Sequence, residues 1–561
     1  MSSQRGPARG GERDAATPGS VCSGTIRSAR PWPHAAARRQ ARSRLFTMSL
    51  ANSTLLQSPP ARVIPLSLLV ERAVPEAAID GDARCFVHSV TADSRSVEAG
   101  ACFVAVRGTN RDGHDYLAEA AARGAAALVV ERGRSPGADI AVPVVQVPDT
   151  AWALAKLAAE HSGLAAIQRE GRLRVVGVTG TNGKSTFCYL MRSILHQAGH
   201  RSALLGTIQY DLLRRTIPAP MTTPPSVELS QMLVEAAEAG AAFAVMEVSS
   251  HALSQRRTDG ILFHVAVFTN LTRDHLDYHR DFDSYLAAKR RLFQALPPHA
   301  TAVVNDQDAN AESVLAACRA GVLRYGFGDQ DVHAVARSMT AEGNEFDLVT
   351  PHGPIHVRSP LVGTHNVANA MAAAAAAIAL RIGLEEIRRG IEAVDYIPGR
   401  LERIPHPAAP FSVLVDYAHT DDALRNVLQA VRNFAPDRPL TVVFGCGGDR
   451  DRSKRPLMAR AAAALADKIV VTSDNPRTED PEAIIEQVVA GFDADHRRRV
   501  AVLVDRREAI QRAIAEAQPG EVVLLAGKGH ETYQEVQGQR LDFDDRVVAA
   551  QALQRRFGSR T

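Results

Sequence analysis

The residues best suited to chemistry stand together at positions 179–185, where the sequence reads Thr-Gly-Thr-Asn-Gly-Lys-Ser. Two glycines and an asparagine favour a tight loop. An apolar run at 175–178 precedes the loop, and apolar residues at helical spacing follow it at 187–194. In a strand–loop–helix unit, backbone amides and the helix N-terminus face an anion, Lys184 adds a positive charge, and the Ser185 hydroxyl can bind Mg²⁺. The stretch therefore predicts a loop that binds the phosphates of a nucleotide.

This loop departs from the general nucleotide-binding pattern at one position. That pattern places a glycine five residues before the glycine of the Gly-Lys pair, and Val178 stands there in this chain. The variant resembles the loop of the Mur ligases and folylpolyglutamate synthetases, which form amide bonds using ATP. A chance glycine-rich turn is the alternative, although strand, loop, lysine, hydroxyl and helix all occur in order.

A carboxylate lies at the end of another apolar strand, predicted at 244–248. In an open α/β sheet, ligands bind beyond the carboxyl ends of the strands. Glu247 is therefore placed for Mg²⁺ if its strand neighbours the strand at 175–178. A glutamate in a surface loop is the alternative.

A second polar segment, 270–279, follows an apolar run at 265–270 and contains His275 and His279. Their i,i+4 spacing is compatible with zinc, but no third ligand or glutamate completes a metalloprotease pattern. The better interpretation is a second Mg²⁺ site with His275 as one ligand.

Length and composition indicate what kind of protein positions these residues. With 561 residues the chain is too long for one core, and 45% hydrophobic residues with few aromatics suit a soluble α/β protein of three domains. A net charge of +3 argues against a dedicated nucleic-acid binder, and no apolar run is long enough to cross a membrane. Six cysteines without a C-x-x-C pair indicate free thiols in a reducing cytosol.

Strands alternate with helices along most of the chain, which predicts mostly parallel, doubly wound sheets. We expect an N-terminal α/β domain at 62–168 and a central domain of P-loop ATPase type, with a mostly parallel sheet, at 169–400. A Rossmann-like C-terminal domain is expected at 401–561. Its predicted strands lie at 413–416, 440–444, 468–472 and 522–526.

Residues 1–61 are expected to form a disordered basic tail. Residues 1–47 are rich in Arg, Ala, Gly and Ser, with almost no acidic residues and little apolar periodicity. The segment can be a transit peptide, a solvated tail, or upstream sequence translated from an early start codon. We favour the last, because Met48 opens a more ordinary N-terminus.

Seven motifs extend the resemblance to the Mur ligase family over the chain from about residue 62 to its end. They are Thr-Gly-Thr-Asn-Gly-Lys-Ser (179–185), Met-Glu-Val-Ser-Ser-His (246–251), Thr-Asn-Leu-Thr-Arg-Asp-His-Leu-Asp-Tyr-His (269–279), Asp-Tyr-Ala-His-Thr (416–420), Phe-Gly-Cys-Gly-Gly-Asp-Arg-Asp (444–451), Asp-Asn-Pro-Arg (474–477) and Gly-Lys-Gly-His-Glu (527–531). Within that family they resemble the members that add meso-2,6-diaminopimelate to UDP-N-acetylmuramoyl-L-alanyl-D-glutamate. One departure is Asp421, where the family usually has proline; this changes loop stiffness more than chemistry.

The resemblance implies an ATP-dependent ligase of peptidoglycan precursor synthesis, with ATP and Mg²⁺ as cofactors. ATP would phosphorylate the side-chain carboxylate of D-glutamate to an acyl phosphate, which the amine then attacks. The implied catalytic residues are Lys184, Glu247, His275 and Lys289, and the implied metal ligands are Ser185, Glu247, His275 and a carbamate formed on Lys289. By itself, Lys289 reads as a solvated helix lysine.

The resemblance also assigns residues to each substrate, and an ordinary polar loop residue is the alternative for each. ATP would contact Gly180, Thr181, Asn182, Gly183, Lys184, Ser185, Thr186, Asn366, Arg400, Asp416 and His419. The UDP-muramyl peptide would contact Ala92, Ser94, Thr109, Asn110 and Arg111 in the N-terminal domain, and Thr222, Thr223, Ser249, Gln255 and Arg257 in the central domain. Diaminopimelate would contact Arg450, Asp474, Asn475, Pro476, Arg477, Gly527 and Glu531 in the C-terminal domain.

The choice of amino acid depends on one carboxylate, which meso-diaminopimelate carries and lysine lacks. Arginine binds a carboxylate through two parallel hydrogen bonds, and Arg477 follows the predicted strand at 468–472. Glu531 could accept hydrogen bonds from the ammonium. A site built around Arg477 should reject lysine by roughly 10⁴-fold or more. The alternative is that Arg477 pairs with Glu479 or Asp480 on the surface.

Two other functions have to be distinguished from this one. A folylpolyglutamate synthetase would share the loop and the lysine, but should lack the N-terminal uridine domain and the Asp-Asn-Pro-Arg segment. A regulatory nucleotide-binding module acting on nucleic acid through the basic tail is opposed by the near-neutral remainder and by Glu247, His275 and Lys289. We therefore predict a cytoplasmic, monomeric ligase whose partners are UDP-N-acetylmuramoyl-L-alanyl-D-glutamate and meso-diaminopimelate, with no nucleic acid and no membrane insertion.

Overall fold

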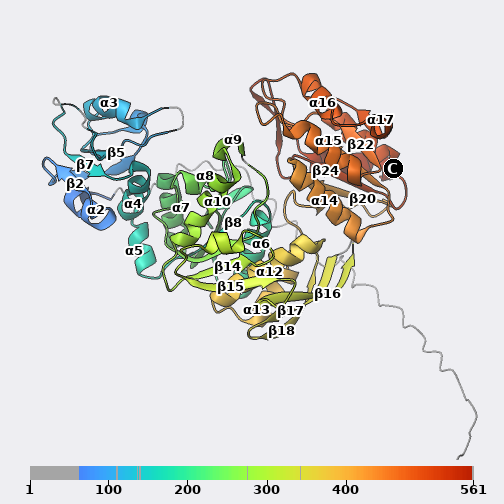
Figure 1. Cartoon of the computed structure of the whole chain (residues 1–561), viewed down its shortest axis with the longest axis horizontal. Helices are drawn as coiled ribbons and strands as arrows, with labels where there is room; N and C mark the ends of the chain where they lie inside the picture. The colour runs from blue at the N-terminus through green and yellow to red at the C-terminus, as the bar shows by residue number, and fades with distance from the viewer. Residues whose placement is uncertain are drawn as a thin grey trace, which may run out of the picture. The chain divides into compact units, whose positions relative to one another are not determined.

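The computed structural model describes residues 62–558, apart from 109–110, 135–136, 138–139, 275 and 341–342. The predicted tail, Thr109, Asn110 and His275 therefore lie outside the described residues. Helices and strands alternate along most of the described chain and build three large sheets (Figure 1). The predicted α/β class is thus confirmed. Within the described ranges, no helix combines the length and the apolar character needed to cross a lipid bilayer.

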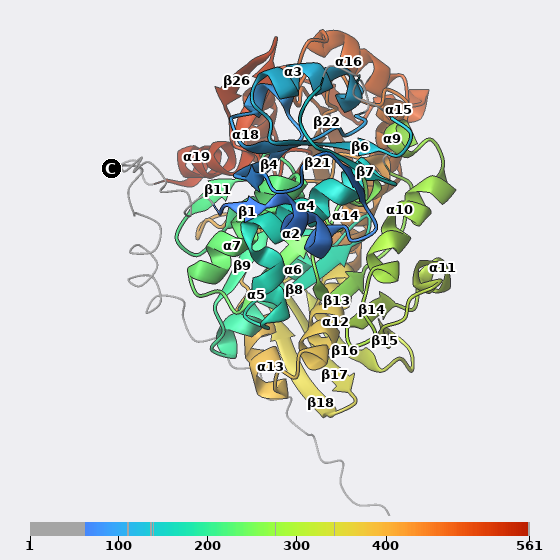
Figure 2. The same cartoon turned by 90° about the vertical axis from the view of Figure 1, so that its left-hand side faces the viewer.

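The first sheet has five strands in the order β2-β7-β6-β5-β4, and its neighbours are parallel except for β2 and β7. Alternate residues point to opposite faces, so Phe103 and Leu128 pack with α3 while Val104 and Val129 pack with α2 and α4. Figure 2 shows these helices on the two sides of the strands. The elements are β2 (Ala78–Asp80), β4 (Ser89–Thr91), β5 (Ala101–Val104), β6 (Ala127–Glu131), β7 (Val144–Val147), α2 (Leu66–Ala73), α3 (Leu117–Ala122) and α4 (Thr150–Ser162).

The central sheet has eleven strands in the order β11-β10-β9-β12-β8-β13-β14-β15-β16-β17-β18. The strands from β9 to β16 are parallel, as the alternation with helices predicts, whereas β10 and β11 at one edge and β17 and β18 at the other are antiparallel to their neighbours. The strands are β8 (Arg174–Thr179), β9 (Ser202–Leu205), β10 (Gln209–Asp211), β11 (Thr216–Pro218), β12 (Phe243–Glu247), β13 (Phe263–Phe268), β14 (Thr301–Asn305), β15 (Gly321–Gly326), β16 (Val332–Thr340), β17 (Gly343–Thr350) and β18 (Gly353–Ser359).

Two helical layers cover the parallel part of this sheet. Val176 and Val178 of β8 face α6, α12 and α13, whereas Val175, which points to the other face, belongs to the core that includes α7 and α10. Both layers exclude water from the strands, which explains why these strands are apolar throughout rather than alternating. The helices are α6 (Lys184–Gln197), α7 (Ser226–Glu238), α10 (Phe282–Gln294), α12 (Thr364–Ala379) and α13 (Leu384–Glu392).

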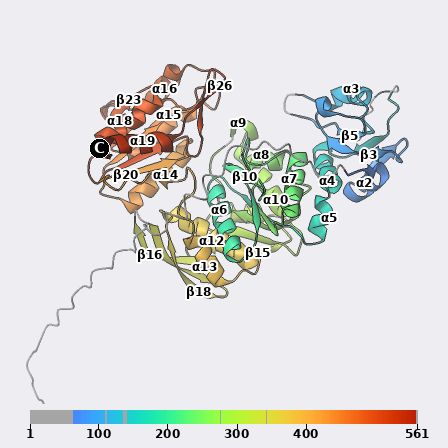
Figure 3. The same ribbon diagram turned by 180° about the vertical axis from the view of Figure 1, so that it is seen from behind.

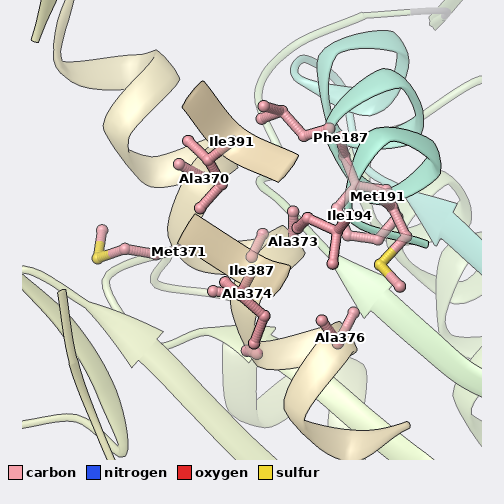
Figure 4. Close-up of a cluster of buried hydrophobic side chains, with 14 of the residues drawn as sticks. Phe187, Met191, Ile194, Ala370, Met371, Ala373, Ala374, Ala376, Ile387 and Ile391 are labelled. Carbon is pink, nitrogen blue, oxygen red and sulfur yellow. The ribbon is translucent and has the colours of Figure 1, made fainter. Parts of the chain in front are cut away.

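The helix that follows the phosphate-binding loop is anchored by close helix–helix packing. Phe187, Met191 and Ile194 of α6 lie against the alanines of α12 and against Ile387 and Ile391 of α13 (Figure 4). A Cβ atom at Gly390 would lie 2.4 Å from the Ile194 Cα, so only glycine permits this approach of α13 to α6. Since α6 is held in this way, the loop at its N-terminus has a fixed support.

The third sheet has six strands in the order β19-β20-β24-β21-β22-β23, all parallel except β19. Helices α14, α15 and α16 pack on one face, and α18 and α19 lie side by side on the other (Figure 3). A small hairpin, β25 and β26, follows β24. The elements are β19 (Glu402–Arg403), β20 (Ser412–Asp416), β21 (Leu440–Phe444), β22 (Lys468–Val471), β23 (Val500–Val502), β24 (Val522–Ala526), β25 (Tyr533–Val536), β26 (Gln539–Asp542), α14 (Asp421–Phe434), α15 (Lys454–Leu465), α16 (Pro481–Val489), α18 (Arg506–Glu516) and α19 (Asp545–Phe557).

Candidate active site

The predicted phosphate-binding loop joins β8 to α6. Gly183 has φ of +87°, and a Cβ atom there would lie 2.4 Å from Asn369 Oδ1, so the turn requires glycine. Asn270, after β13, steadies the loop: its side-chain Oδ1 accepts from the Asn182 amide at 2.9 Å and its backbone oxygen accepts from the Thr181 amide at 2.9 Å. The loop is therefore held by the neighbouring strand end.

Lys184 is the first residue of α6, and its side chain turns back over the loop. Its Nζ donates to the backbone oxygens of Gly180 (2.9 Å) and Thr181 (2.8 Å). Burial lowers the pKa of Lys184, and the nearby carboxylates of Glu247 and Asp274 oppose that effect. A cation held by loop carbonyls can exchange them for the oxygens of a bound phosphate.

Glu247 ends β12, which lies directly beside β8 with Glu247 opposite Val178, as the sequence suggested. The carboxylate is only 2% exposed. Its Oε1 accepts from Ser185 Oγ at 2.8 Å and from the Thr207 amide at 2.9 Å, and its Oε2 accepts from Thr207 Oγ1 at 2.9 Å. The structure thus brings the predicted metal ligands Ser185 and Glu247 into contact at the carboxyl end of the sheet.

Lys289 lies inside the protein and not on a solvated helix face. It is 1% exposed, and burial lowers its pKa well below the ordinary range, an effect to which Lys184 adds. Its Nζ lies 4.4 Å from the ring centre of Tyr285, whose hydroxyl is 3.1 Å from Thr181 Oγ1. Among the described residues the amine has no hydrogen-bond or ion-pair partner, which favours its neutral form.

His279, the other histidine of the spacing that suggested zinc, contacts a serine. It is buried, with Nε2 2.9 Å from Ser250 Oγ. No group of three or more His, Cys, Asp or Glu residues within the described part of the chain is arranged to hold a metal ion. His275, the predicted ligand, is outside that part.

A cavity of about 420 Å³ opens beside the loop and contains most residues assigned to ATP. Arg400 lies near the loop, with Nη2 3.5 Å from Ser185 Oγ and its guanidinium 5.0 Å from the Tyr417 ring centre. Asn369, which the sequence did not single out, lines the cavity next to Asn366. The assigned residues that line it are Asn182, Gly183, Ser185, Thr186, Asn366, Arg400 and Asp416.

Asp416 and His419 lie at the end of β20, and both are affected by burial. Burial raises the pKa of Asp416, whose oxygens accept from the amides of Leu401 (2.7 Å) and Ala418 (2.8 Å). Burial also lowers the pKa of His419. Whereas Asp416 lines the cavity beside the loop, His419 lines the next one, so this segment does not place all its assigned residues in one cavity.

The departure from the family pattern, Asp421, is the first residue of α14. Thr420 caps this helix by accepting a hydrogen bond from the Ala423 amide at 3.2 Å. The first helical position suits proline because its amide needs no partner, and it suits an acid because of the helix dipole. The substitution is therefore compatible with the same local structure.

A second cavity, of about 460 Å³, contains most residues assigned to diaminopimelate. They come from the loops that follow β21, β22 and β24, and Arg273 and Asp274, from the segment after β13, also line the cavity. The assigned residues lining it are Arg450, Asp474, Asn475, Arg477, Gly527 and Glu531. Pro476 is buried and does not line the cavity; a Cβ atom at Gly448 would lie 1.9 Å from its backbone oxygen, so Pro476 supports the neighbouring loop instead.

Arg477 has a φ of +53°, in the left-handed region. Contacts with the β25–β26 hairpin hold this backbone: the Arg477 amide donates to Glu535 O at 3.0 Å, and the Gln537 amide donates to Arg477 O at 2.6 Å. The side chain donates from Nη1 to Gly448 O at 2.7 Å, and Nε lies 3.4 Å from Glu535 Oε2. Its ion-pair partner is therefore Glu535, not Glu479 or Asp480 as the alternative supposed.

Two buried cations behind these loops were missed from the sequence. Arg455 is fully buried and donates to both carboxylate oxygens of Glu479, at 2.9 and 3.1 Å. Lys528 is fully buried and contacts Asn475 and Glu531. The signal for Lys528 was its place between two glycines in a motif that already resembled a known family; Arg455 had none.

The residues assigned to the UDP-muramyl peptide lie in two groups. The group in the central domain forms a hydrogen-bond network that begins at Glu247. Thr223 Oγ1 donates to the Glu247 backbone oxygen at 2.8 Å, and Arg257 donates to Gln255 Oε1 at 2.9 Å. The members of this group are Thr222, Thr223, Ser249, Gln255 and Arg257. Ala92, Ser94 and Arg111 lie on loops of the first sheet, where Arg111 Nη1 is 3.4 Å from Tyr116 OH. No described hydrogen bond or ion pair joins the two groups.

Comparisons with known proteins cover all three sheets. Family profiles match residues 86–162 (Mur ligase family, catalytic domain), 178–377 (Mur ligase middle domain) and 399–529 (Mur ligase, glutamate ligase domain). The UDP-N-acetylmuramoyl-L-alanyl-D-glutamate–2,6-diaminopimelate ligase of Geobacter sulfurreducens is 44% identical over 504 residues, covering 86% of this chain and 97% of the relative.

Two further similarities carry the same name. The enzyme of Geobacillus kaustophilus is 45% identical over 471 residues, covering 83% of this chain and 94% of the relative. A solved structure of a ligase with this name is 34% identical, has a TM-score of 0.65, and covers 89% of this chain and 100% of its own.

Proposed function

Because the chain belongs to the Mur ligase family, we propose that it joins meso-2,6-diaminopimelate to UDP-N-acetylmuramoyl-L-alanyl-D-glutamate, using ATP, in peptidoglycan precursor synthesis. One observation supports this most: the two cavities share a lining segment. Asp416 and Ala418 face the cavity beside the phosphate-binding loop, while Tyr417 and His419 face the other. A nucleotide and an amino acid bound there would lie on opposite sides of one strand end, close enough for one reaction.

The reaction needs both cavities because a carboxylate is a poor acyl donor. An oxygen of the D-glutamyl side-chain carboxylate attacks the γ-phosphorus of ATP, and ADP leaves. The amine of diaminopimelate then attacks the acyl carbon, the carbon–oxygen bond to phosphate breaks, and the amine proton passes to solvent. Lys184 would offset the negative charge that accumulates as the phosphates and the carboxylate approach.

The oxygen donors near the loop fit Mg²⁺. Ser185 Oγ and the Glu247 carboxylate are hard ligands 2.8 Å apart, and Mg²⁺ binds through one or two protein oxygens while substrate phosphates and water complete its shell. When bound, the ion would neutralise phosphate charge. Ser185 and Glu247 would hold one ion, and His275 with a modified Lys289 would hold a second.

The burial of Lys289 supports its modification to a carbamate. Burial lowers its pKa and so favours the neutral amine, which is the form that adds to CO₂. The nitrogen forms a bond to the carbon of CO₂ and releases one proton, giving an anionic carbamate. A buried amine that has no hydrogen-bond or ion-pair partner in the described part of the chain thereby becomes a ligand for a cation.

The amino-acid end of the site has a charge pattern that suits a zwitterion. Arg477 would face the distal carboxylate of diaminopimelate, and Glu531 its distal ammonium. Lysine has no distal carboxylate, so Arg477 would discriminate against it. We place the reaction in the cytoplasm, which the free cysteines Cys85, Cys102, Cys188, Cys318 and Cys446 support.

The test is phosphate release from ATP in the presence of the UDP-muramyl dipeptide and one amino acid at a time. We expect turnover with meso-diaminopimelate, little with L-lysine, and none when the UDP-muramyl dipeptide is omitted. Turnover with glutamate and a folate in place of these substrates would show a folylpolyglutamate synthetase. Comparable kcat/KM for lysine and diaminopimelate would overturn the proposed choice of amino acid.

A further inference from the structure

Lys528 lies behind the second cavity, which under the proposed function is the amino-acid cavity, and it has no part in the chemistry proposed above. It is 0% exposed. It follows β24 and stands between Gly527, with φ of +119°, and Gly529, with φ of +52°. A Cβ atom at Gly529 would lie 2.7 Å from the Tyr417 Cβ, so the chain turns here in a way that other residues could not follow. The two glycines thus direct the lysine inward, between the loops that line the cavity.

The ammonium of Lys528 completes a closed ring of hydrogen bonds. Its Nζ donates to Asn475 Oδ1 at 3.1 Å and to Glu531 Oε2 at 2.9 Å, and Asn475 Nδ2 donates to the same Glu531 oxygen at 2.9 Å. Asn475 Oδ1 also accepts from the Glu535 amide at 2.9 Å. Two donors on the amide oxygen and one acceptor at the amide nitrogen fix the orientation of Asn475.

The ring leaves one oxygen of Glu531 available to a ligand. Both donors in the ring bind Oε2, and among the described residues Oε1 has no partner. The Glu531 side chain is 17% exposed and lines the cavity. Oε1 is therefore available as an acceptor on a cavity-lining side chain whose other oxygen is fixed by two hydrogen bonds.

Lys528 also supplies the positive charge that this corner of the site needs. Asp474 Oδ1 lies 3.9 Å from its Nζ, so two carboxylates share one ammonium. The other cations close by are engaged elsewhere: Arg506 binds both oxygens of Asp545, at 2.7 and 2.8 Å, and Arg477 pairs with Glu535. Two nearby carboxylates, one buried and one only partly exposed, would disfavour this arrangement without a cation between them.

We propose that Lys528 is a positioning residue for the distal ammonium of the amino-acid substrate. It acts through Glu531 and Asn475 and does not touch the substrate itself. The inference rests on the proposed function, because it assumes that a diamino acid binds in this cavity. It assigns recognition of the two distal groups to different residues: the carboxylate to Arg477, and the ammonium to Glu531 as held by Lys528.

Three amino acids separate these two contributions in the Lys528→Met variant. Meso-diaminopimelate has both distal groups, L-lysine lacks the distal carboxylate, and L-2-aminopimelate lacks the distal ammonium. In the wild-type enzyme we expect kcat/KM for diaminopimelate to exceed that for 2-aminopimelate by about 30-fold, the effect of a charged hydrogen bond. In Lys528→Met this preference should fall to about threefold or less, while the preference over lysine is kept.

The kinetic constants distinguish positioning from general damage. KM for diaminopimelate should rise, while KM for ATP and for the UDP-muramyl dipeptide stays within about twofold of the wild type. An unchanged preference over 2-aminopimelate would overturn the inference. So would an equal loss with all three amino acids. If the wild-type enzyme turns over none of the three, the proposed function itself is wrong and this inference falls with it.

Two further variants test whether the loss of selectivity is specific to the charge of Lys528. Lys528→Gln keeps a donor without the charge; it should show the same selective loss, and it replaces Lys528→Met if that variant does not fold. Lys468→Met is the matched control: it removes a lysine that lies 3.4 Å from the buried Glu521 on the same sheet, away from the cavity. The control should leave all three amino-acid preferences unchanged.

Discussion

The two cavities are built in different ways. Beside the phosphate-binding loop, the chemical groups are held mainly by backbone and by the ends of adjacent parallel strands: Lys184 rests on carbonyls of its own loop, and Glu247 lies opposite Val178. In the amino-acid cavity, side chains are held mainly by charged side chains from other loops. Arg477 depends on Glu535, and Asn475 depends on Lys528.

This difference separates what local sequence can specify from what tertiary structure must add. A strand, a glycine-containing loop and a helix place phosphate ligands within one short segment. An amino-acid pocket that must distinguish two similar substrates needs charges brought together from several loops, each with its own partner. We therefore expect changes in the first cavity to abolish the reaction and changes in the second to alter its selectivity.

The largest effect is expected for Lys184→Ala. Loss of the cation at the phosphates should lower kcat/KM by about 10³-fold or more. Among the described residues, the hydrogen bonds of Lys184 Nζ go to carbonyls of its own loop, so we expect the melting temperature to stay close to that of the wild type. Phosphate release and thermal unfolding measure the two quantities, with Lys468→Ala as a control of equal charge change. Turnover near the wild-type rate would remove Lys184 from the phosphate site.

Lys289→Met should also be nearly inactive if the carbamate is a metal ligand. Small carboxylates added to Lys289→Ala should partly restore turnover by filling the space of the missing anion. Activity measured with and without added bicarbonate tests the requirement in the wild type. Full activity of Lys289→Met would contradict the role, as would a free amine in active enzyme supplied with bicarbonate, seen by mass spectrometry under native conditions.

The same residue predicts a dependence of stability on pH. Burial lowers the pKa of unmodified Lys289 below its ordinary value of 10.5. Between the lowered value and 10.5 the unfolded chain binds the proton and the folded chain does not, so the free energy of unfolding rises with pH through that window. Lys289→Met lacks this effect. In bicarbonate-free buffer we therefore expect the free energy of unfolding of Lys289→Met to exceed that of the wild type at neutral pH, and the difference to shrink as pH rises toward 10.5. Denaturant unfolding measures both values. A difference that grows with pH would contradict the assignment.

A smaller effect, on selectivity, is expected for Arg477→Ala. The sequence alone suggested roughly 10⁴-fold rejection of lysine, but Glu535 pairs with the guanidinium and reduces the cost of leaving it without a substrate carboxylate. We therefore expect a preference of about 10²-fold for diaminopimelate over lysine. Arg477→Ala should lose most of it, and Arg477→Lys should recover part. Arg540→Ala, on the same hairpin, is the control and should keep the full preference.

The smallest effect is expected for Glu479→Gln, which removes the carboxylate that pairs with the buried Arg455. Hydrogen bonds from Arg455 lower the pKa of Glu479 to about 2. The ionised carboxylate therefore stabilises the fold fully above pH 4.5, the ordinary pKa that it has in the unfolded chain. This stabilisation is lost as pH falls toward about 2. We expect about 2 kcal/mol of destabilisation near neutral pH, shrinking in acid. The control, Glu482→Gln on the exposed side of α16, should show neither the destabilisation nor its decrease in acid. If the destabilisation by Glu479→Gln were the same at every pH, the ion pair would be excluded as its cause.

Much of the first cavity could be read from the sequence because its signals are local. The apolar strands and the two glycines predict the loop, and the position of Glu247 at a strand end predicts that it lies beside that loop, where it accepts a hydrogen bond from Ser185. The sequence also predicted the α/β class, which the fold confirms. The burial of Lys289 could not be read, because a lysine in an amphipathic helix looks the same whether or not another helix covers it.

The supports of the second cavity had no comparable signal. The β25–β26 hairpin is largely polar and half-exposed, so it lacks the apolar alternation that identifies a strand. The antiparallel extension β16–β18 of the central sheet was missed for a different reason: its strands follow one another without helices, unlike the pattern that guided the prediction. The partners of Arg455 and Lys528 are set by how distant loops meet, which no local pattern records.

The alternation of residues 416–419 between the two cavities has an energetic consequence. Any displacement of this strand end that favours one bound ligand also changes the surface met by the other. Energetic coupling of this kind is reciprocal: the factor by which the nucleotide changes the affinity for the amino acid equals the factor by which the amino acid changes the affinity for the nucleotide. The order in which the two bind is then decided by rates, while the free energy of the fully loaded enzyme is the same by either route.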